Sequence, residues 1–193
     1  MKSLRLFGII TVAIEWIGIV LGAYYTQNFN PDIPISVATT SARPLPLIFG
    51  VVLSCVGITY FVFSLSLKNS NRAIPYIAAI AGLAFMLTGW IPYTGLGGHL
   101  DTLHNTAVDV AILGYAGMVL LMTKHPHKRI KQSSMAILSA LLVACIFSFV
   151  SLYVIHKFTA IAQLVILVLL QIWTIIIFWH ESKLSIEQEN LPK

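Results

Sequence analysis

Polar side chains that could do chemistry gather between Trp90 and Ala111, in a sequence that is otherwise strongly apolar. A further carboxylate, Glu15, stands in the middle of a separate apolar run. Imidazoles and carboxylates are common general acids, general bases and metal ligands. We therefore expect a pocket for a ligand or an ion in which these side chains meet. The candidate pocket residues are Glu15, His99, Asp101, His104, Asn105 and Asp109.

These residue types leave several chemistries open. If the site is catalytic, His104 is the candidate base, and Asp109 or Asp101 would orient it. No cofactor is predicted, but the spacing His99-x-Asp101-x-x-His104 is a plausible set of zinc ligands and keeps zinc as an alternative. No serine nucleophile can be placed against His104 from the sequence, and the histidines lie near the ends of the apolar runs, where paired haem ligands would not face each other.

The composition identifies the elements that must position these side chains. Of the 193 residues, 58% are hydrophobic and 10% are charged, whereas soluble domains carry about 25% charged residues. Apolar runs long enough to cross a bilayer, roughly 20 residues each, recur six times along the chain. The fold class predicted is all-α: a polytopic transmembrane bundle of six helices, with residues 1–193 in a single domain. The predicted spans are 5–24, 45–67, 73–93, 103–124, 134–155 and 158–180, followed by a short cytoplasmic tail, 181–193.

The distribution of basic residues predicts the orientation of the bundle. With the N-terminus in the cytoplasm, ten of the twelve Lys and Arg residues fall on the cytoplasmic side, as the positive-inside rule requires. We expect a plasma-membrane protein with both termini cytoplasmic. The net charge of +5 favours membrane lipids as partners, and the segment His125–Arg129 is interpreted as a basic loop on lipid headgroups. No basic domain protrudes from the bilayer, so nucleic acid is excluded as a partner.

Small and polar residues at helical spacing predict which faces of the helices meet. In the first span Gly8, Thr11 and Glu15 share a face with Gly18 and Gly22, which form a G-x-x-x-G pair. If this face packs within the bundle, Glu15 points inward. The alternative is that the face packs against a second copy or another membrane protein. Gln163, Gln171 and Thr174 share an inward face of the last span. The glycines expected at helix contacts are Gly18, Gly22, Gly50, Gly57, Gly82 and Gly89.

The two carboxylates within the predicted spans need a partner. Apart from Arg5 and Lys124 at the very ends of two spans, no Lys or Arg occurs inside any span, and an ionised carboxylate at the centre of a membrane helix costs about 2.5–3.5 kcal/mol. Glu15 and Asp109 could be protonated, could accept a hydrogen bond from His104 or the glutamines, or could bind a cation. The loop from Thr26 to Pro44 could close over the pocket as a lid or lie on the surface.

Several short motifs are shared with a known family. They are Asn30-Pro31, Pro34-Ile35-Ser36, Pro46, Phe49-Gly50, Gly89-Trp90-Ile91-Pro92, and Leu103-His104 with Ala107. In this order they resemble the prokaryotic membrane family catalogued as domain of unknown function 998, over about residues 5–180. The resemblance implies a six-span bundle and brings no activity with it. That family often opens its last helix with a Gln-Arg pair, whereas Gln163 is followed here by Leu164, so no role is carried over for the pair.

Three classes of function remain open. The leading one is the non-catalytic binding or transport of a small amphiphile, a lipid or an ion at a pocket facing the outer side. The second is an enzyme acting on lipid at the outer leaflet, with His104 or a metal assisting. The third is a membrane subunit that pairs with a second copy or with another membrane protein.

Overall fold

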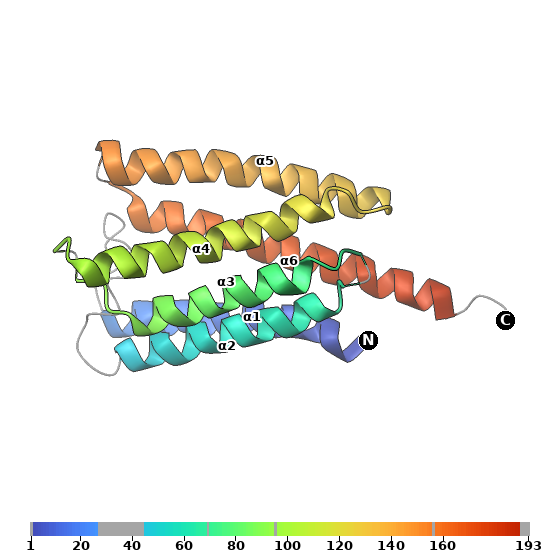
Figure 1. Ribbon diagram of the computed structural model, residues 1–193, viewed down its shortest axis with the longest axis horizontal. Coiled ribbons are helices and arrows are strands. Elements are labelled where there is room, and N and C mark those ends of the chain that lie inside the picture. The colour runs from blue at the N-terminus through green and yellow to red at the C-terminus, as the bar shows by residue number, and fades with distance from the viewer. Residues whose placement is uncertain (1, 27–44, 69, 95, 156, 190–193) are drawn as a thin grey trace.

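The computed structural model describes residues 2–26, 45–68, 70–94, 96–155 and 157–189, and within these ranges it contains helices and turns but no strand (Figure 1). The helices are α1 Lys2–Thr26, α2 Leu45–Leu65, α3 Ile74–Trp90, α4 His99–Met122, α5 Lys128–Val150 and α6 Thr159–Glu189. A short π-helix, η2 (Ser151–Ile155), continues α5. The predicted all-α bundle is therefore confirmed. The loop considered as a lid lies outside the described residues.

Four helices are long and apolar enough to cross a membrane. These segments are Pro46–Leu65, His99–Met122, Lys128–Val150 and Ala160–Glu181. Two shorter apolar helices, Leu6–Gly18 and Ile74–Trp90, accompany them among the residues described. Four of the described helices thus have the length and composition of membrane-spanning segments.

The helix limits differ from the predicted spans. The spans were drawn where apolar runs give way to charged residues, whereas a helix continues until glycine or proline ends it. Helix α4 starts at His99, directly after Gly98, and not at residue 103. Helix α5 starts at Lys128, two residues after Pro126, and not at 134. Helix α6 continues to Glu189 through most of the predicted tail. No Gly or Pro interrupts the sequence between 159 and 189, so nothing ends that helix earlier.

The six helices form a closed ring. Each helix packs against its neighbours in the chain, and α6 returns to pack against α1 (Figure 1). Successive helices run in opposite directions, since the connections between the described ones are short. Residues from the two ends of the chain therefore meet inside the bundle.

Aromatic side chains fill the interior of this ring. The rings of Tyr60 and Tyr115 stack with their centroids 3.7 Å apart. Phe85 and Trp173 meet Tyr115 edge-on, at 6.0 and 6.5 Å. These side chains come from α2, α3, α4 and α6, and all four are buried. The core thus joins helices that are not neighbours in the chain.

Glycines bring α2 and α3 into direct backbone contact. A Cβ atom placed on Gly82 would lie 2.7 Å from the carbonyl oxygen of Gly57, and one on Gly57 would collide with the carbonyl of Gly82. Gly50 and Gly89 continue this contact, since a Cβ on Gly89 would lie 3.0 Å from the Cα atom of Gly50. Close backbone approach through small residues is how membrane helices associate without a hydrophobic driving force.

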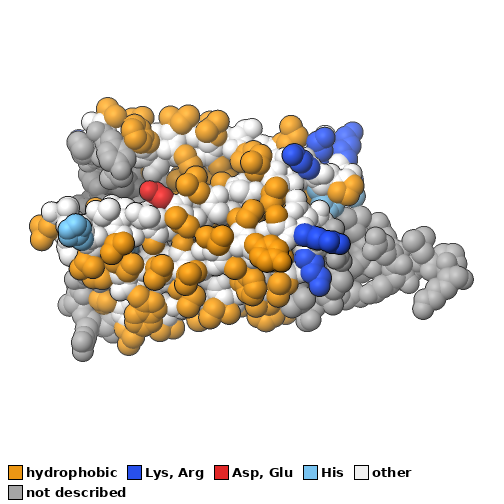
Figure 2. All heavy atoms as spheres, in the orientation of Figure 1, with side chains coloured by type: hydrophobic (Ala, Val, Ile, Leu, Met, Phe, Trp, Pro, Cys, Tyr) orange, Lys and Arg blue, Asp and Glu red, His pale blue; other side chains and the backbone are white. Residues whose placement is uncertain are grey.

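The surface separates basic and apolar regions. Exposed basic residues gather at one end of the bundle, where α1 begins and α6 ends (Figure 2). We call this the basic end; its exposed residues are Lys68, Arg72, Lys124, Lys128, Arg129 and Lys131. Large hydrophobic side chains are exposed along the helices between the basic end and the opposite end. Such a surface is suited to lipid contact along its length and to headgroup contact at the basic end.

Candidate functional site

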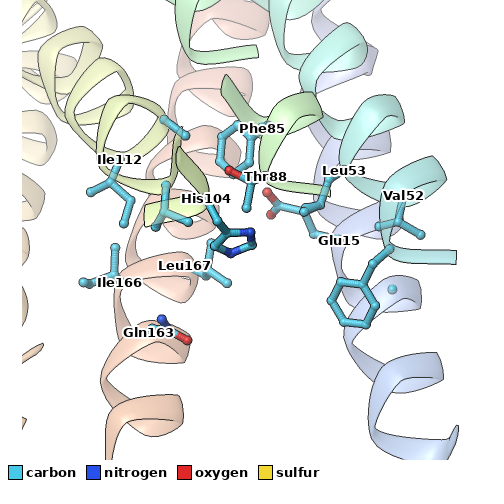
Figure 3. Close-up of a pocket in the computed structure, with 14 residues that line it drawn as sticks. Glu15, Val52, Leu53, Phe85, Thr88, His104, Ile112, Gln163, Ile166 and Leu167 are labelled. Atoms are coloured by element: carbon cyan, nitrogen blue, oxygen red, sulfur yellow. The ribbon is translucent and has the colours of Figure 1, made fainter. Parts of the chain in front are cut away.

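A cavity of about 130 Å³ lies inside the ring, between α1, α2, α3, α4 and α6 (Figure 3). Its walls are apolar side chains, among them Phe49, Leu53 and Phe85 on one side and Ile166 and Leu167 on the other. The polar side chains that line it are Glu15, Thr88, His104 and Gln163. A largely apolar cavity with a few polar groups is the usual form of a small-molecule site.

His104 supplies the polar group of greatest chemical interest. The side chain is fully buried, and its Nδ1 lies 2.7 Å from the carbonyl oxygen of Ile91. Because a carbonyl only accepts, Nδ1 carries the proton and donates, which leaves Nε2 of the neutral ring as an acceptor. Nε2 is buried and meets no hydrogen-bond donor from the described residues. The cavity therefore holds an unsatisfied acceptor.

The loop after α3 makes this orientation of His104 possible. Pro92 disfavours a helical conformation at Ile91, and Ile91 is extended, with φ −85° and ψ 117°. Its carbonyl is consequently free to accept from the imidazole instead of a helical N–H. Tyr93 packs against the same ring, with centroids 5.4 Å apart. In the motif Trp90-Ile91-Pro92, the proline indicated that Ile91 is not helical. The sequence did not indicate that His104 donates to the Ile91 carbonyl.

Glu15 reaches the cavity from α1 and is held by α6. Gln171 Nε2 donates to Glu15 Oε2 at 2.6 Å, and both side chains are buried. The spacing with Gly8, Thr11 and Gly18 predicted that Glu15 turns into the bundle, and the structure confirms this. In Figure 3 the Glu15 carboxyl group and the His104 ring point toward one another from different walls. One end of the cavity is thus polar.

The remaining polar groups of the lining belong to α3 and α6. The Thr88 hydroxyl donates to the carbonyl of Ala84 in its own helix at 2.9 Å, so it can offer the cavity only an acceptor, the lone pairs of its oxygen. Gln163 lines the cavity from α6. Thr88 was absent from the predicted pocket, although a hydroxyl beside Gly89 in an apolar helix was the signal that could have identified it.

Asp101 is buried outside the cavity lining and organises the loop before α4. Its Oδ2 accepts from the backbone N–H of Gly97 at 2.8 Å and from the hydroxyl of Thr94 at 3.0 Å. Its Oδ1 accepts from the backbone N–H of Thr94. A carboxylate in the first turn of a helix also interacts favourably with the helix dipole. Asp101 therefore stabilises the turn that precedes the helix of His104.

The other predicted pocket residues lie on the surface of α4. His99 is exposed at the first helical position, and Asn105 and Asp109 are exposed further along. Residues four apart advance by about 40° around the helix axis, so Asp101, Asn105 and Asp109 pass from the buried to the exposed side. Of the six candidate residues, the cavity brings together Glu15 and His104.

The zinc candidates lie in different surroundings. His99 is exposed, Asp101 is bonded within its loop, and His104 faces the cavity. In the part of the chain that the structure describes, no group of three His, Cys, Asp or Glu side chains is placed to hold a metal ion.

A second polar cluster lies at the basic end. His125 Nε2 is 3.1 Å from Glu181 Oε1 and 3.2 Å from the hydroxyl of Ser70, and His125 Nδ1 accepts from the backbone N–H of His127 at 3.1 Å. The His125 and Glu181 side chains are only 7% and 10% exposed. The interpretation of this segment as a loop on headgroups is therefore wrong for His125, which packs inward against α6, although Lys128 and Arg129 are exposed.

This cluster should make the stability of the bundle depend on pH. Burial lowers the pKa of His125 below its usual value, while the Glu181 carboxylate raises it and His127 lowers it further. The unfolded chain, with a histidine pKa of about 6.5, then binds protons more readily than the folded chain. We expect full stability above pH 6.5 and a falling thermal midpoint in detergent as the pH drops from 6.5 toward 5. His125→Gln, which can still donate to Glu181, should flatten this dependence; an equal acid loss in that variant would assign the effect to another group.

Comparison of the chain with models of known protein families, with curated proteins and with solved structures finds no match. What the cavity binds must therefore follow from the chemistry of its own residues.

Proposed function

We propose that the protein is a multi-pass membrane protein that binds a small amphiphile in the cavity between Glu15 and His104. The observation that carries the proposal is the unsatisfied, buried Nε2 of His104 in the wall of a largely apolar cavity. The apolar part of the ligand would exchange its contacts with lipid for contacts with the cavity walls. One hydrogen-bond donor on the ligand would satisfy His104 Nε2. Transport of the same molecule would be built on this binding step.

The cavity limits the size of the ligand. A dry cavity of about 150 Å³ lined by Leu, Ile and Phe is known to accept benzene, and the volume here is about 130 Å³. One aromatic ring or a short alkyl chain therefore fills this volume.

The polar groups limit the chemistry of the ligand. His104 Nε2 needs an O–H or N–H donor, and leaving a buried acceptor unpaired costs about 1–3 kcal/mol. An alcohol, a phenol or an amine satisfies this requirement. An ion is disfavoured, because most of the lining is apolar and the Glu15 carboxyl group already accepts from Gln171.

The proposal includes a topology. We place all six helices in the plasma membrane with the basic end in the cytoplasm, since exposed Lys and Arg gather there. Helix α3 has 17 residues and spans about 26 Å, slightly less than the roughly 30 Å hydrocarbon core. Its place in the ring between α2 and α4 supports a spanning position, because short helices are accommodated by local bilayer thinning.

Phenol and toluene have nearly the same shape and differ in one hydrogen-bond donor, so they test the proposal directly. We expect both to raise the thermal midpoint of the protein in lipid nanodiscs, with apparent affinity obtained from the concentration dependence. Compared at equal concentrations in the membrane, phenol should bind about 3- to 10-fold more tightly, as one hydrogen bond of 0.5–1.5 kcal/mol implies. His104→Phe should remove this preference.

Two tryptophan variants of α6 separate the cavity from the bilayer. Leu167→Trp fills the cavity and should abolish stabilisation by both compounds, whereas Val165→Trp, on the exposed side at 41% exposure, should leave it intact. Equal binding of the two compounds by the native protein would refute the role of His104. Unchanged binding by Leu167→Trp would refute the cavity as the site.

A further inference from the structure

Asp109 is an exposed acidic side chain within the membrane-crossing segment of α4. It lies ten residues after His99, at the start of α4, and hence about 15 Å along the helix axis. Val110 and Leu113 beside it are exposed and apolar. Asp109 makes no hydrogen bond or ion pair with any described residue. A carboxylate is thus presented on an apolar helix face.

A second polar side chain lies one helical turn away on the same face. Asn105 is exposed and likewise has no partner among the described residues. The neighbouring threonines differ, because Thr106 donates to Thr102 O at 2.8 Å and Thr102 donates to Gly98 O at 3.3 Å. The hydroxyls are therefore satisfied within α4, while the amide of Asn105 and the carboxylate of Asp109 remain available.

Within the residues that the structure describes, no other helix covers this face. Figure 1 shows α5 close to α4 at the basic end and diverging from it toward the opposite end. The buried residues of α5 run from Ile130 to Ala144, whereas Phe149 and Val150 at its end are exposed. Figure 2 shows an acidic side chain on this side of the molecule, with hydrophobic side chains beside it toward the basic end.

We infer that the α4 face bearing Asn105 and Asp109 docks a transmembrane helix of another protein, and that this helix carries a Lys or Arg opposite Asp109. Charged side chains in membrane helices face protein and pair, because lipid cannot solvate them. The membrane-crossing segments of a second copy do not supply the cation, since no Lys or Arg occurs at residues 6–26, 45–67, 73–123, 132–156 or 158–182. The Asn105 amide would add a hydrogen bond across the interface.

The glycine face of α1 is not the docking surface. A Cβ atom on Gly18 would collide with Val52 of α2, so this face is already filled from within the bundle. The inferred interface is also independent of the ligand cavity, because neither Asn105 nor Asp109 lines it.

A designed helix tests the inference without requiring the natural partner. The probe is a leucine-rich transmembrane peptide with one central lysine, and its association with the labelled full-length protein is followed by energy transfer in phosphatidylcholine vesicles. We expect Asp109→Asn to weaken the association at least tenfold. The same peptide with glutamine in place of lysine should bind the native protein as weakly as the variant binds the lysine peptide.

A register shift provides the control for specificity. In the double variant Asp109→Asn/Leu113→Asp, the acid moves one turn along the same exposed face, and a peptide whose lysine is moved by one turn should recover binding. Equal association of native protein and Asp109→Asn with the lysine peptide would overturn the inference. So would self-association of the native protein that Asp109→Asn abolishes, because the occupant would then be a second copy.

Discussion

Adding one methyl group at Gly57 is expected to push α2 away from α3 and to destabilise the bundle by about 1–3 kcal/mol or more, the range found for overpacked cores. The new Cβ atom would collide with the backbone carbonyl of Gly82. A backbone carbonyl cannot rotate aside as a side chain can, so relief requires the two helices to separate. Gly57→Ala should therefore lower the unfolding free energy measured by denaturant titration in mixed micelles.

Gly117 offers a matched control on α4. The nearest atom to a Cβ there is Ile77 Cγ2 at 3.8 Å, an ordinary van der Waals distance. Because alanine favours helix over glycine by up to about 1 kcal/mol, Gly117→Ala should be neutral or slightly stabilising. Similar stability of the two alanine variants would show that α2 and α3 are less tightly packed than their backbones indicate.

Replacing either partner of the Glu15–Gln171 pair is the second change with a large expected effect. Glu15→Leu leaves the Gln171 amide buried without its acceptor, and Gln171→Leu leaves the Glu15 carboxyl group without its donor. Either orphaned group should cost about 1–3 kcal/mol. The double variant should be less destabilised than the sum of the two single ones, because it removes both polar groups together. A coupling of 0.5–3 kcal/mol is expected for residues in direct contact.

Ser139→Ala serves as the control for this cycle. The Ser139 hydroxyl bonds to Met135 O within α5, which does not line the cavity, so its loss should combine additively with Glu15→Leu. Strict additivity of Glu15→Leu and Gln171→Leu would mean that the hydrogen bond between α1 and α6 contributes nothing to the stability of the ring.

Helix faces were predictable from the sequence because spacing around one helix depends only on its own geometry. The small residues of α1 assigned Glu15 to the interior, and the same reasoning assigned Gln171 and Thr174, both of which are buried. These predictions needed no knowledge of which helices are neighbours. The pairing of Glu15 with Gln171 did need it, and the sequence left open protonation, a hydrogen bond from His104 or from the glutamines, and a bound cation.

The predicted pocket on α4 joined residues that are close in sequence but whose side chains lie on different sides of the helix. The step of four residues from Asp101 to Asn105 and Asp109 was treated as a single stripe, and the 40° advance per step divides it between the interior and the surface. Two further features were out of reach. The bond from His104 to Ile91 depends on how the loop folds back, and the cavity depends on side chains from five helices.

The closed ring also constrains the order of assembly during synthesis. Glu15 and Gln171 are 156 residues apart in the chain, so at about 5–20 residues per second roughly 8–31 s pass between their emergence. In the proposed topology, the Glu15 carboxyl group of α1 enters the membrane before its donor exists. The first helix is therefore expected to depend on protonation or on the insertion machinery until α6 arrives, and truncations that end before Gln171 should leave α1 poorly inserted.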